Sequence, residues 1–228
     1  MVCLQGGKET EMEADRIAVK PFAISFTGLI AMESGGALLL TAGPGLSSMS
    51  VLLGLRIFEI FMFFGVILVW GEGLSSVGLN RDLLWSGLAR GIFWSLIFGA
   101  VVAGGFAILI IAGIDPFSMV RVHLPTTPLK LLIFLTTGAF IGPLAEEIFF
   151  RAILYGFLRR WGIVPALVIS NLMFVLMHPL AGSIPLPQIV GGIVFTLAYE
   201  IKGELSAPVT IHILGNTALF SLSLLVSG

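Results

Sequence analysis

Charged side chains are scarce in this sequence: Asp, Glu, Lys and Arg make up 11% of the 228 residues, against 57% for the apolar set. The mean hydropathy of +1.07 lies well above the range of water-soluble globular domains. The composition therefore argues against a soluble fold. The net charge is −1 and the basic residues are scattered along the chain, which excludes a strongly basic nucleic-acid-binding surface.

Cysteine is almost absent. The single Cys3 cannot form an internal disulfide or a multi-cysteine metal site, so nothing indicates an oxidised framework. Internal repeats of 20–50 residues are also missing, which argues against a repeat architecture. The first apolar run is about as long as a spanning helix and follows an acidic tail, so we expect it to be retained rather than cleaved as a signal peptide.

Long apolar runs dominate what is present. A membrane-spanning helix needs about 20 mostly apolar residues, and the runs lie near 22–42, 52–70, 88–112, 130–158, 163–180, 187–200 and 208–226. The predicted fold class is all-α, a polytopic membrane helix bundle with about seven or eight transmembrane helices. We expect a polar N-terminal tail, 1–21, and a single transmembrane domain, 22–228. The run at 187–200 is short and begins with Pro187, so a partial or tilted helix is expected there.

The distribution of Lys and Arg between alternate loops predicts the orientation. With the N-terminus inside, the outer loops receive only Arg121 and Lys130. The inner side receives Lys8, Arg16, Lys20, Arg81, Arg90, Arg159, Arg160 and Lys202. This bias predicts an integral membrane protein with its N-terminus inside, and small size with no targeting signal favours a prokaryotic cytoplasmic membrane.

The sequence EEIFFR at 146–151 places three ionisable residues in the middle of the fourth apolar run. A charge at the membrane centre costs roughly 2.5–3.5 kcal/mol, so such groups are usually functional. Glu147 and Arg151 are four residues apart on one helix face and can form an ion pair. Glu146 points roughly 140° away from Arg151 at 100° per residue, which leaves it free to act as a base.

Two further polar pairs lie in later apolar runs, each with a spacing of four residues. Phe174 precedes His178, and His212 precedes Asn216. By helical rise, Glu146 and His178 lie about 20 and 23 Å from the inner ends of their runs and could meet at one level. Asn216 lies only about 12 Å beyond Pro208 by the same measure, so we expect its helix to be tilted or the cavity to extend inward.

Peptide hydrolysis in a water-filled membrane cavity would need these groups. A carboxylate helped by an imidazole, Glu146 with His178, can deprotonate water, while His212 and Asn216 can donate hydrogen bonds to the oxyanion. No cofactor is therefore preferred. The same side chains could instead hold zinc or another divalent metal, although no HExxH motif occurs and Asn is a poor zinc ligand.

In this order, EExxxR, FxxxH and HxxxN resemble the motifs of the CAAX prenyl protease and bacteriocin-processing (CPBP, or ABI) family of intramembrane proteases. The resemblance covers roughly residues 130–220. It implies a helical membrane fold whose cavity opens toward the cytosol, with Glu146 and His178 on the water, His212 and Asn216 at the oxyanion, and Glu147, Arg151 and Phe174 in support. It also implies an endopeptidase acting on membrane-associated or prenylated substrates, with a peptide or prenylated protein and the lipid bilayer as partners.

Other interpretations of the same residues stay open at the level of sequence. Glutamates and histidines at mid-membrane depth also suit a proton-coupled transporter. A non-catalytic scaffold or immunity protein could keep the family fold and use the charges only to tie helices together. Arg56 and Glu59, three residues apart in the second run, are expected to form a structural pair or an interhelical bridge. His123, in a loop with two prolines, is expected to be solvated.

Overall fold

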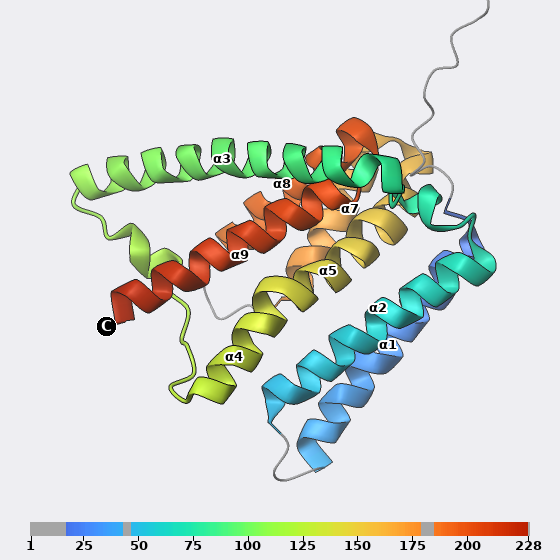
Figure 1. Ribbon diagram of the computed structural model, residues 1–228, viewed down its shortest axis with the longest axis horizontal. Helices are drawn as coiled ribbons and strands as arrows, with labels where there is room; N and C mark the ends of the chain where they lie inside the picture. Colours follow the sequence, from blue (N-terminus) through green and yellow to red (C-terminus); the bar gives the residue numbers. More distant parts are fainter. Residues whose placement is uncertain (1–16, 43–46, 179–184, 228) are drawn as a thin grey trace, which may run out of the picture.

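The computed structural model describes residues 17–42, 47–178 and 185–227 of this chain. All regular structure in these ranges is helical (Figure 1), which confirms the predicted all-α fold class. Most of the predicted polar tail, together with Cys3, lies outside the described residues. The first helix begins at Val19, slightly before the predicted start of the transmembrane domain.

Seven helical stretches correspond to the seven predicted apolar runs, and two short 3₁₀ turns lie between them. One stretch, the long central helix from Pro128 to Trp161, changes its hydrogen-bond pattern along its length. In chain order the elements are α1 (Val19–Ala42), α2 (Ser48–Trp70), η2 (Leu74–Val77), α3 (Arg81–Ile111), η3 (Pro116–Met119), α4 (Pro128–Thr136), η4 (Thr137–Ile141), α5 (Gly142–Glu147), η5 (Ile148–Tyr155), α6 (Gly156–Leu158), η6 (Arg159–Trp161), α7 (Ile163–Leu176), α8 (Leu186–Lys202) and α9 (Ser206–Ser227).

Local sequence chemistry explains where several helices begin and end. The side chain of Asn80 accepts a hydrogen bond from the backbone N–H of Asp82 across 3.1 Å and caps α3. Gly203 ends α8 with a left-handed φ of 65°, a conformation that glycine adopts without a steric penalty. Pro128 lies in the first turn of α4. The backbone N–H groups of a first turn make no hydrogen bond within the helix, so the lack of an N–H in proline costs nothing there.

Five helical stretches are long and apolar enough to cross a membrane, which confirms the predicted polytopic bundle. They are Val19–Thr41, Ser48–Trp70, Leu74–Ile111, Pro128–Trp161 and Ser206–Val226.

The other two predicted spans are shorter than expected. Helix α7 has 14 residues, about 21 Å at the α-helical rise, and α8 has 17 residues, about 26 Å, whereas the hydrocarbon core of a bilayer is about 30 Å thick. The prediction of a span over 163–180 is therefore wrong at its end, since the helix stops at Leu176. Pro179 in the sequence gives a physical reason, because a proline disfavours helical geometry in the residue before it. Helix α7 is therefore too short to form a complete span.

The central helix is the core of the bundle, and every residue of η5 is buried. The α1–α2 hairpin packs along one side of it, where the rings of Phe22 and Phe157 stack with centroids 3.9 Å apart (Figure 1). On another side α3 crosses α9 at close range. A Cβ atom at Gly91 of α3 would lie only 2.5 Å from Cβ of Thr210 on α9, so glycine is needed at this crossing.

Candidate active site

The central helix widens on both sides of the predicted glutamates. The segments η4 and η5 are π-helical, and the short α5 lies between them, with Glu146 and Glu147 as its last two residues. A π-helical turn holds an extra residue and changes which side chains face the same direction, and such turns are frequent at functional sites. The unusual backbone geometry therefore points to the same part of the central helix as the buried charged residues do.

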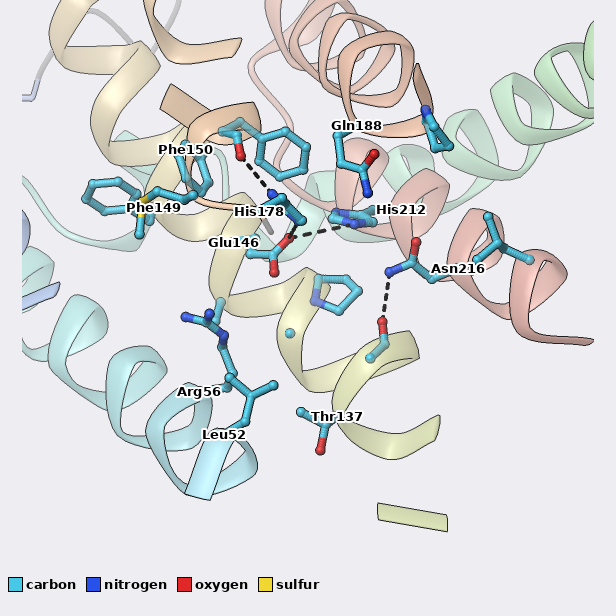
Figure 2. Close-up of a pocket in the computed structure, with 18 of the residues that line it drawn as sticks. Leu52, Arg56, Thr137, Glu146, Phe149, Phe150, His178, Gln188, His212 and Asn216 are labelled. Atoms are coloured by element: carbon cyan, nitrogen blue, oxygen red, sulfur yellow. Dashed lines mark hydrogen bonds and ion pairs between the residues drawn. The ribbon is translucent and has the colours of Figure 1, made fainter. Parts of the chain in front are cut away.

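A cavity of about 740 Å³ lies beside α5, enclosed by side chains from α1, α2, the central helix, α7, α8 and α9. Glu146, His178, His212 and Asn216 all line it, as does Phe174 (Figure 2). The structure thus brings together the four residues predicted for catalysis: Glu146 from the central helix, His178 from just past the end of α7, and His212 and Asn216 from α9. Glu147 and Arg151 do not line the cavity and are buried behind it.

Glu146 faces both histidines. One of its carboxylate oxygens, Oε2, lies 3.8 Å from Nε2 of His178 and 3.8 Å from Nε2 of His212. Both distances are too long for direct hydrogen bonds but suit groups that share a bridging water. The carboxylate and the two imidazoles therefore converge on one point in the cavity.

The other ring nitrogen of each histidine is held by a hydrogen-bond acceptor. Nδ1 of His178 lies 2.7 Å from the carbonyl oxygen of Phe174, and Nδ1 of His212 lies 2.7 Å from Oε1 of Glu147. A carbonyl and an ionised carboxylate can only accept, so both Nδ1 atoms carry the hydrogen. In the neutral rings the Nε2 lone pairs consequently face Glu146.

Arg151 accounts for the burial of a charged Glu147. Its Nη1 lies 3.0 Å from Oε1 of Glu147, which is the predicted ion pair, and its Nη2 donates to the carbonyl oxygen of Gly192 across 3.1 Å. The guanidinium also lies 4.6 Å from the ring centroid of Phe174 and 5.2 Å from that of Phe195. Both charges are almost fully buried, so each depends on the other to offset its desolvation.

Asn216 ties α9 to the first π-helical segment. Its Nδ2 donates to the carbonyl oxygen of Gly138 across 2.7 Å. An amide group carries two N–H donors, so a second one is available for a ligand. The buried turn at Glu204 and Leu205, from which α9 starts, accounts for the predicted depth mismatch of this residue, because the helix begins inside the bundle rather than at its surface.

Two residues of α8 that the motif analysis did not single out also belong to the site. Phe195 stacks on the imidazole of His212, with centroids 4.5 Å apart and planes at 20°, and so packs against a face of the ring. Gln188 points into the cavity near His212 (Figure 2). Gln188 could have been noticed in the sequence as a polar residue inside an apolar run. Phe195 could not, because nothing in the sequence distinguishes it from a phenylalanine that only packs in the core.

The ionic cluster on α1 and α2 also lines this cavity. Nη1 of Arg56 lies 2.5 Å from Oε2 of Glu59 and 2.8 Å from Oε1 of Glu33, so both the predicted local pair and the predicted interhelical bridge are present. Figure 2 shows Arg56 on the wall opposite the histidines. Sequence reasoning did not foresee that this cluster would face Glu146. His123 is exposed and lies outside the cavity lining, as expected.

At the point where Glu146, His178 and His212 converge, the site offers two imidazole nitrogens and one carboxylate. Among residues 17–42, 47–178 and 185–227, no group of three or more His, Cys, Asp or Glu side chains is arranged to hold a metal ion.

Comparison with known proteins agrees with these motifs. Residues 128–218 match the family described as type II CAAX prenyl endopeptidase Rce1-like. The membrane-embedded CAAX protease MroQ of Staphylococcus aureus (strain USA300) is 35% identical over 94 residues, which are 38% of this chain and 38% of that protein. This chain thus spans about two fifths of the length of the curated relative it matches. No solved structure matches it.

The matched segment contains every residue of the three motifs, from Glu146 to Asn216. Residues 128–218 of this chain are therefore similar to that family of CAAX endopeptidases. The helices before residue 128, including α2 with Arg56, lie outside the match.

Proposed function

We propose that this protein is an intramembrane endopeptidase that hydrolyses peptide bonds of membrane-associated or prenylated substrates. The observation that carries the proposal is the placement of two imidazole Nε2 atoms, each 3.8 Å from the same oxygen of Glu146, in a cavity among membrane-spanning helices. The match of residues 128–218 to a family described as endopeptidases supports it.

Glu146 and His178 activate the water in this mechanism. A water between them donates hydrogen bonds to the carboxylate and to Nε2 of His178, and Glu146 takes its proton as the oxygen attacks the scissile carbonyl carbon. The new C–O bond forms as the carbonyl π electrons move to the oxygen. The proton held by Glu146 then passes to the leaving amine when the C–N bond breaks, which restores the carboxylate.

His212 and Asn216 stabilise the oxyanion. For Nε2 of His212 to donate to the oxyanion it must carry a proton in addition to the one on Nδ1, which faces Glu147. We assign this second proton to His212 because its ring lies between the carboxylates of Glu146 and Glu147, which favour a positive charge there. Its Nε2–H and the second N–H of Asn216 then donate to the developing negative oxygen.

Purified protein in detergent, incubated with a panel of farnesylated CAAX peptides and membrane-protein tails, tests the proposal. Wild type is expected to cleave at least one substrate, and Glu146→Gln is expected to lower kcat by about 10²–10⁴-fold, the usual contribution of a general base. His123→Ala changes the third histidine of the chain, which lies outside the cavity, and should keep wild-type activity. Equal activity of wild type and Glu146→Gln would reject this role for Glu146.

The metal-free form of the mechanism has its own test. A chelator such as phenanthroline is expected to leave kcat unchanged in the same assay. Strong inhibition that added zinc reverses would contradict this expectation. It would indicate that the histidines hold a zinc ion and that this ion, rather than Glu146, activates the water.

A further inference from the structure

The cavity wall opposite the histidines carries more acidic than basic groups. Glu33 of α1 and Glu59 of α2 both approach the same nitrogen of Arg56, Nη1, at 2.8 and 2.5 Å. All three side chains line the cavity that Glu146 lines, and we call them the acidic wall (Figure 2 shows its Arg56). One guanidinium thus serves two carboxylates, which leaves one negative charge in excess when both are ionised.

The other cations near the cavity do not balance this excess charge. Arg151 is paired with Glu147 behind the cavity, and His212 lies between Glu146 and Glu147. Arg121, the other arginine of the lining, is exposed, and within the described part of the chain no ion pair joins it to the acidic wall. Ionisable groups among membrane-spanning helices are costly, and they commonly mark a path or site for a charged ligand.

Each glutamate of the acidic wall also has an oxygen without a partner. The side chain of Glu59 is only 1% exposed, and its Oε1 is buried and accepts no hydrogen bond. Glu33 turns Oε1 to Arg56, and its Oε2 has no partner among residues 17–42, 47–178 and 185–227. Its side chain is 32% exposed, so a ligand in the cavity can reach it. A buried acceptor that receives no hydrogen bond is unfavourable, so the wall is incomplete without a further donor.

We propose that the acidic wall is a subsite for a basic side chain of the substrate, a lysine or an arginine close to the scissile bond. This rests on the proposed endopeptidase function and specifies its substrate class. The ammonium or guanidinium group donates hydrogen bonds to Glu33 and Glu59 and neutralises the excess charge. Such charge-assisted hydrogen bonds are stronger than neutral ones. Glu33 and Glu59 lie before residue 128, so the family match assigns them no role.

The shared cavity fixes where the basic residue lies in the substrate. Glu146 and the acidic wall line one cavity of about 740 Å³. An extended peptide advances about 3.4 Å per residue, so only a few residues separate the cleaved bond from the side chain that the wall binds. A basic residue far along the chain from the scissile bond cannot use this subsite.

A lysine scan tests the subsite. Lysine is placed in turn at each position around the scissile bond of a peptide that the enzyme cleaves in detergent, and the matched peptides carry norleucine, which lacks the charge. At one position the lysine peptide should have a kcat/KM about 10-fold or more above that of its norleucine match, the usual worth of a hydrogen bond to a charged group. Equal values at every position would overturn the proposal, and would mean that a proton on one glutamate balances the wall.

Variants of the two glutamates assign the preference to the wall. In Glu33→Gln and in Glu59→Gln the ratio of kcat/KM between the lysine and norleucine peptides should fall toward one. Both peptides are compared in the same protein, so a general loss of folding or activity cancels from the ratio. Glu72→Gln, at an exposed glutamate outside the cavity, should keep the wild-type ratio. A preference for lysine that survives in both wall variants would overturn the proposal.

Peptide binding separates this inference from the proposed function. Fluorescently labelled lysine and norleucine peptides are titrated with Glu146→Gln protein, and anisotropy gives the dissociation constants without cleavage. Tighter binding of a lysine peptide is expected, and Glu33→Gln added to Glu146→Gln should abolish the difference. Cleavage by wild type with no effect of charge on binding or kcat/KM would refute the subsite alone. Charge-dependent binding with no cleavage of any peptide by wild type would support the subsite and refute the endopeptidase.

Discussion

Oε1 of Glu147 accepts from two partners at once: Nδ1 of His212 lies 2.7 Å away and Nη1 of Arg151 lies 3.0 Å away. The buried ion pair is therefore also the support of a cavity-lining imidazole. Neighbouring residues in the chain thus have different surroundings: Glu146 lines the cavity, and Glu147 lies behind it against the ring of His212, to which we assign the oxyanion in the proposed mechanism.

Replacing Glu147 by Gln tests this assignment. The amide keeps the shape of the side chain but removes the charge that stabilises a doubly protonated His212. We expect kcat to fall by about 10²-fold, at the lower end of the range for groups that assist proton transfer, with a much smaller change in KM. Glu72→Gln, at an exposed site outside the cavity, serves as the control. A variant with normal kcat would show that His212 needs no carboxylate behind it.

Asn216 offers a second test of oxyanion stabilisation. Removal of one oxyanion donor commonly lowers kcat by about 10²–10³-fold, and we expect Asn216→Ala to show this loss in steady-state assays while binding of substrate changes little. Because the variant also loses the hydrogen bond to Gly138, its melting temperature must be measured alongside. Thr217→Val, which changes the next residue on α9, is the matched control. An Asn216→Ala enzyme that loses only substrate affinity would assign this side chain to binding.

The buried pair itself makes a prediction about stability. Arg151→Met leaves Glu147 charged without its ion-pair partner, and breaking a buried pair in this way costs about 3–5 kcal/mol. Adding Glu147→Gln to Arg151→Met removes the uncompensated charge, so the double variant should be more stable than Arg151→Met alone. The free energies of unfolding of wild type, Glu147→Gln, Arg151→Met and the double variant, measured in detergent, form a double-mutant cycle. Additive losses in the double variant would mean that the two side chains are not coupled.

Much of the site could be predicted because its spacing is local. A separation of four residues puts Glu147 beside Arg151 and Phe174 beside His178 in any helix, whatever the tertiary structure. The convergence of the three motifs on one cavity required tertiary information. The depth estimate for Asn216 used helix length from Pro208 alone, which takes no account of the buried turn before α9.

Residues without a local signature were harder to predict. Phe195 is one of many phenylalanines in apolar runs, and only its stacking on His212 shows that it belongs to the site. Arg56 was correctly paired with Glu59 from their spacing, but spacing does not tell which way a pair faces. The length of α7 was overestimated, because hydropathy extends past Leu176 although the backbone leaves the helix before Pro179.

Glycines of α3 make a final prediction, about the packing that holds α9 in place. In Gly91→Ala the new Cβ would lie 2.5 Å from Cβ of Thr210 and 2.8 Å from the backbone oxygen of Ala207. Relief of such overpacking typically costs about 1–3 kcal/mol, so the variant should unfold more readily in detergent. Gly99→Ala, two turns further along the same helix, meets no atom within 4 Å and controls for the change in helix propensity. Because His212 and Asn216 both lie on α9, we expect Gly91→Ala also to lower kcat, and Gly99→Ala to leave it unchanged. Equal stability of the two variants would show that α3 and α9 are not held at the close distance described here.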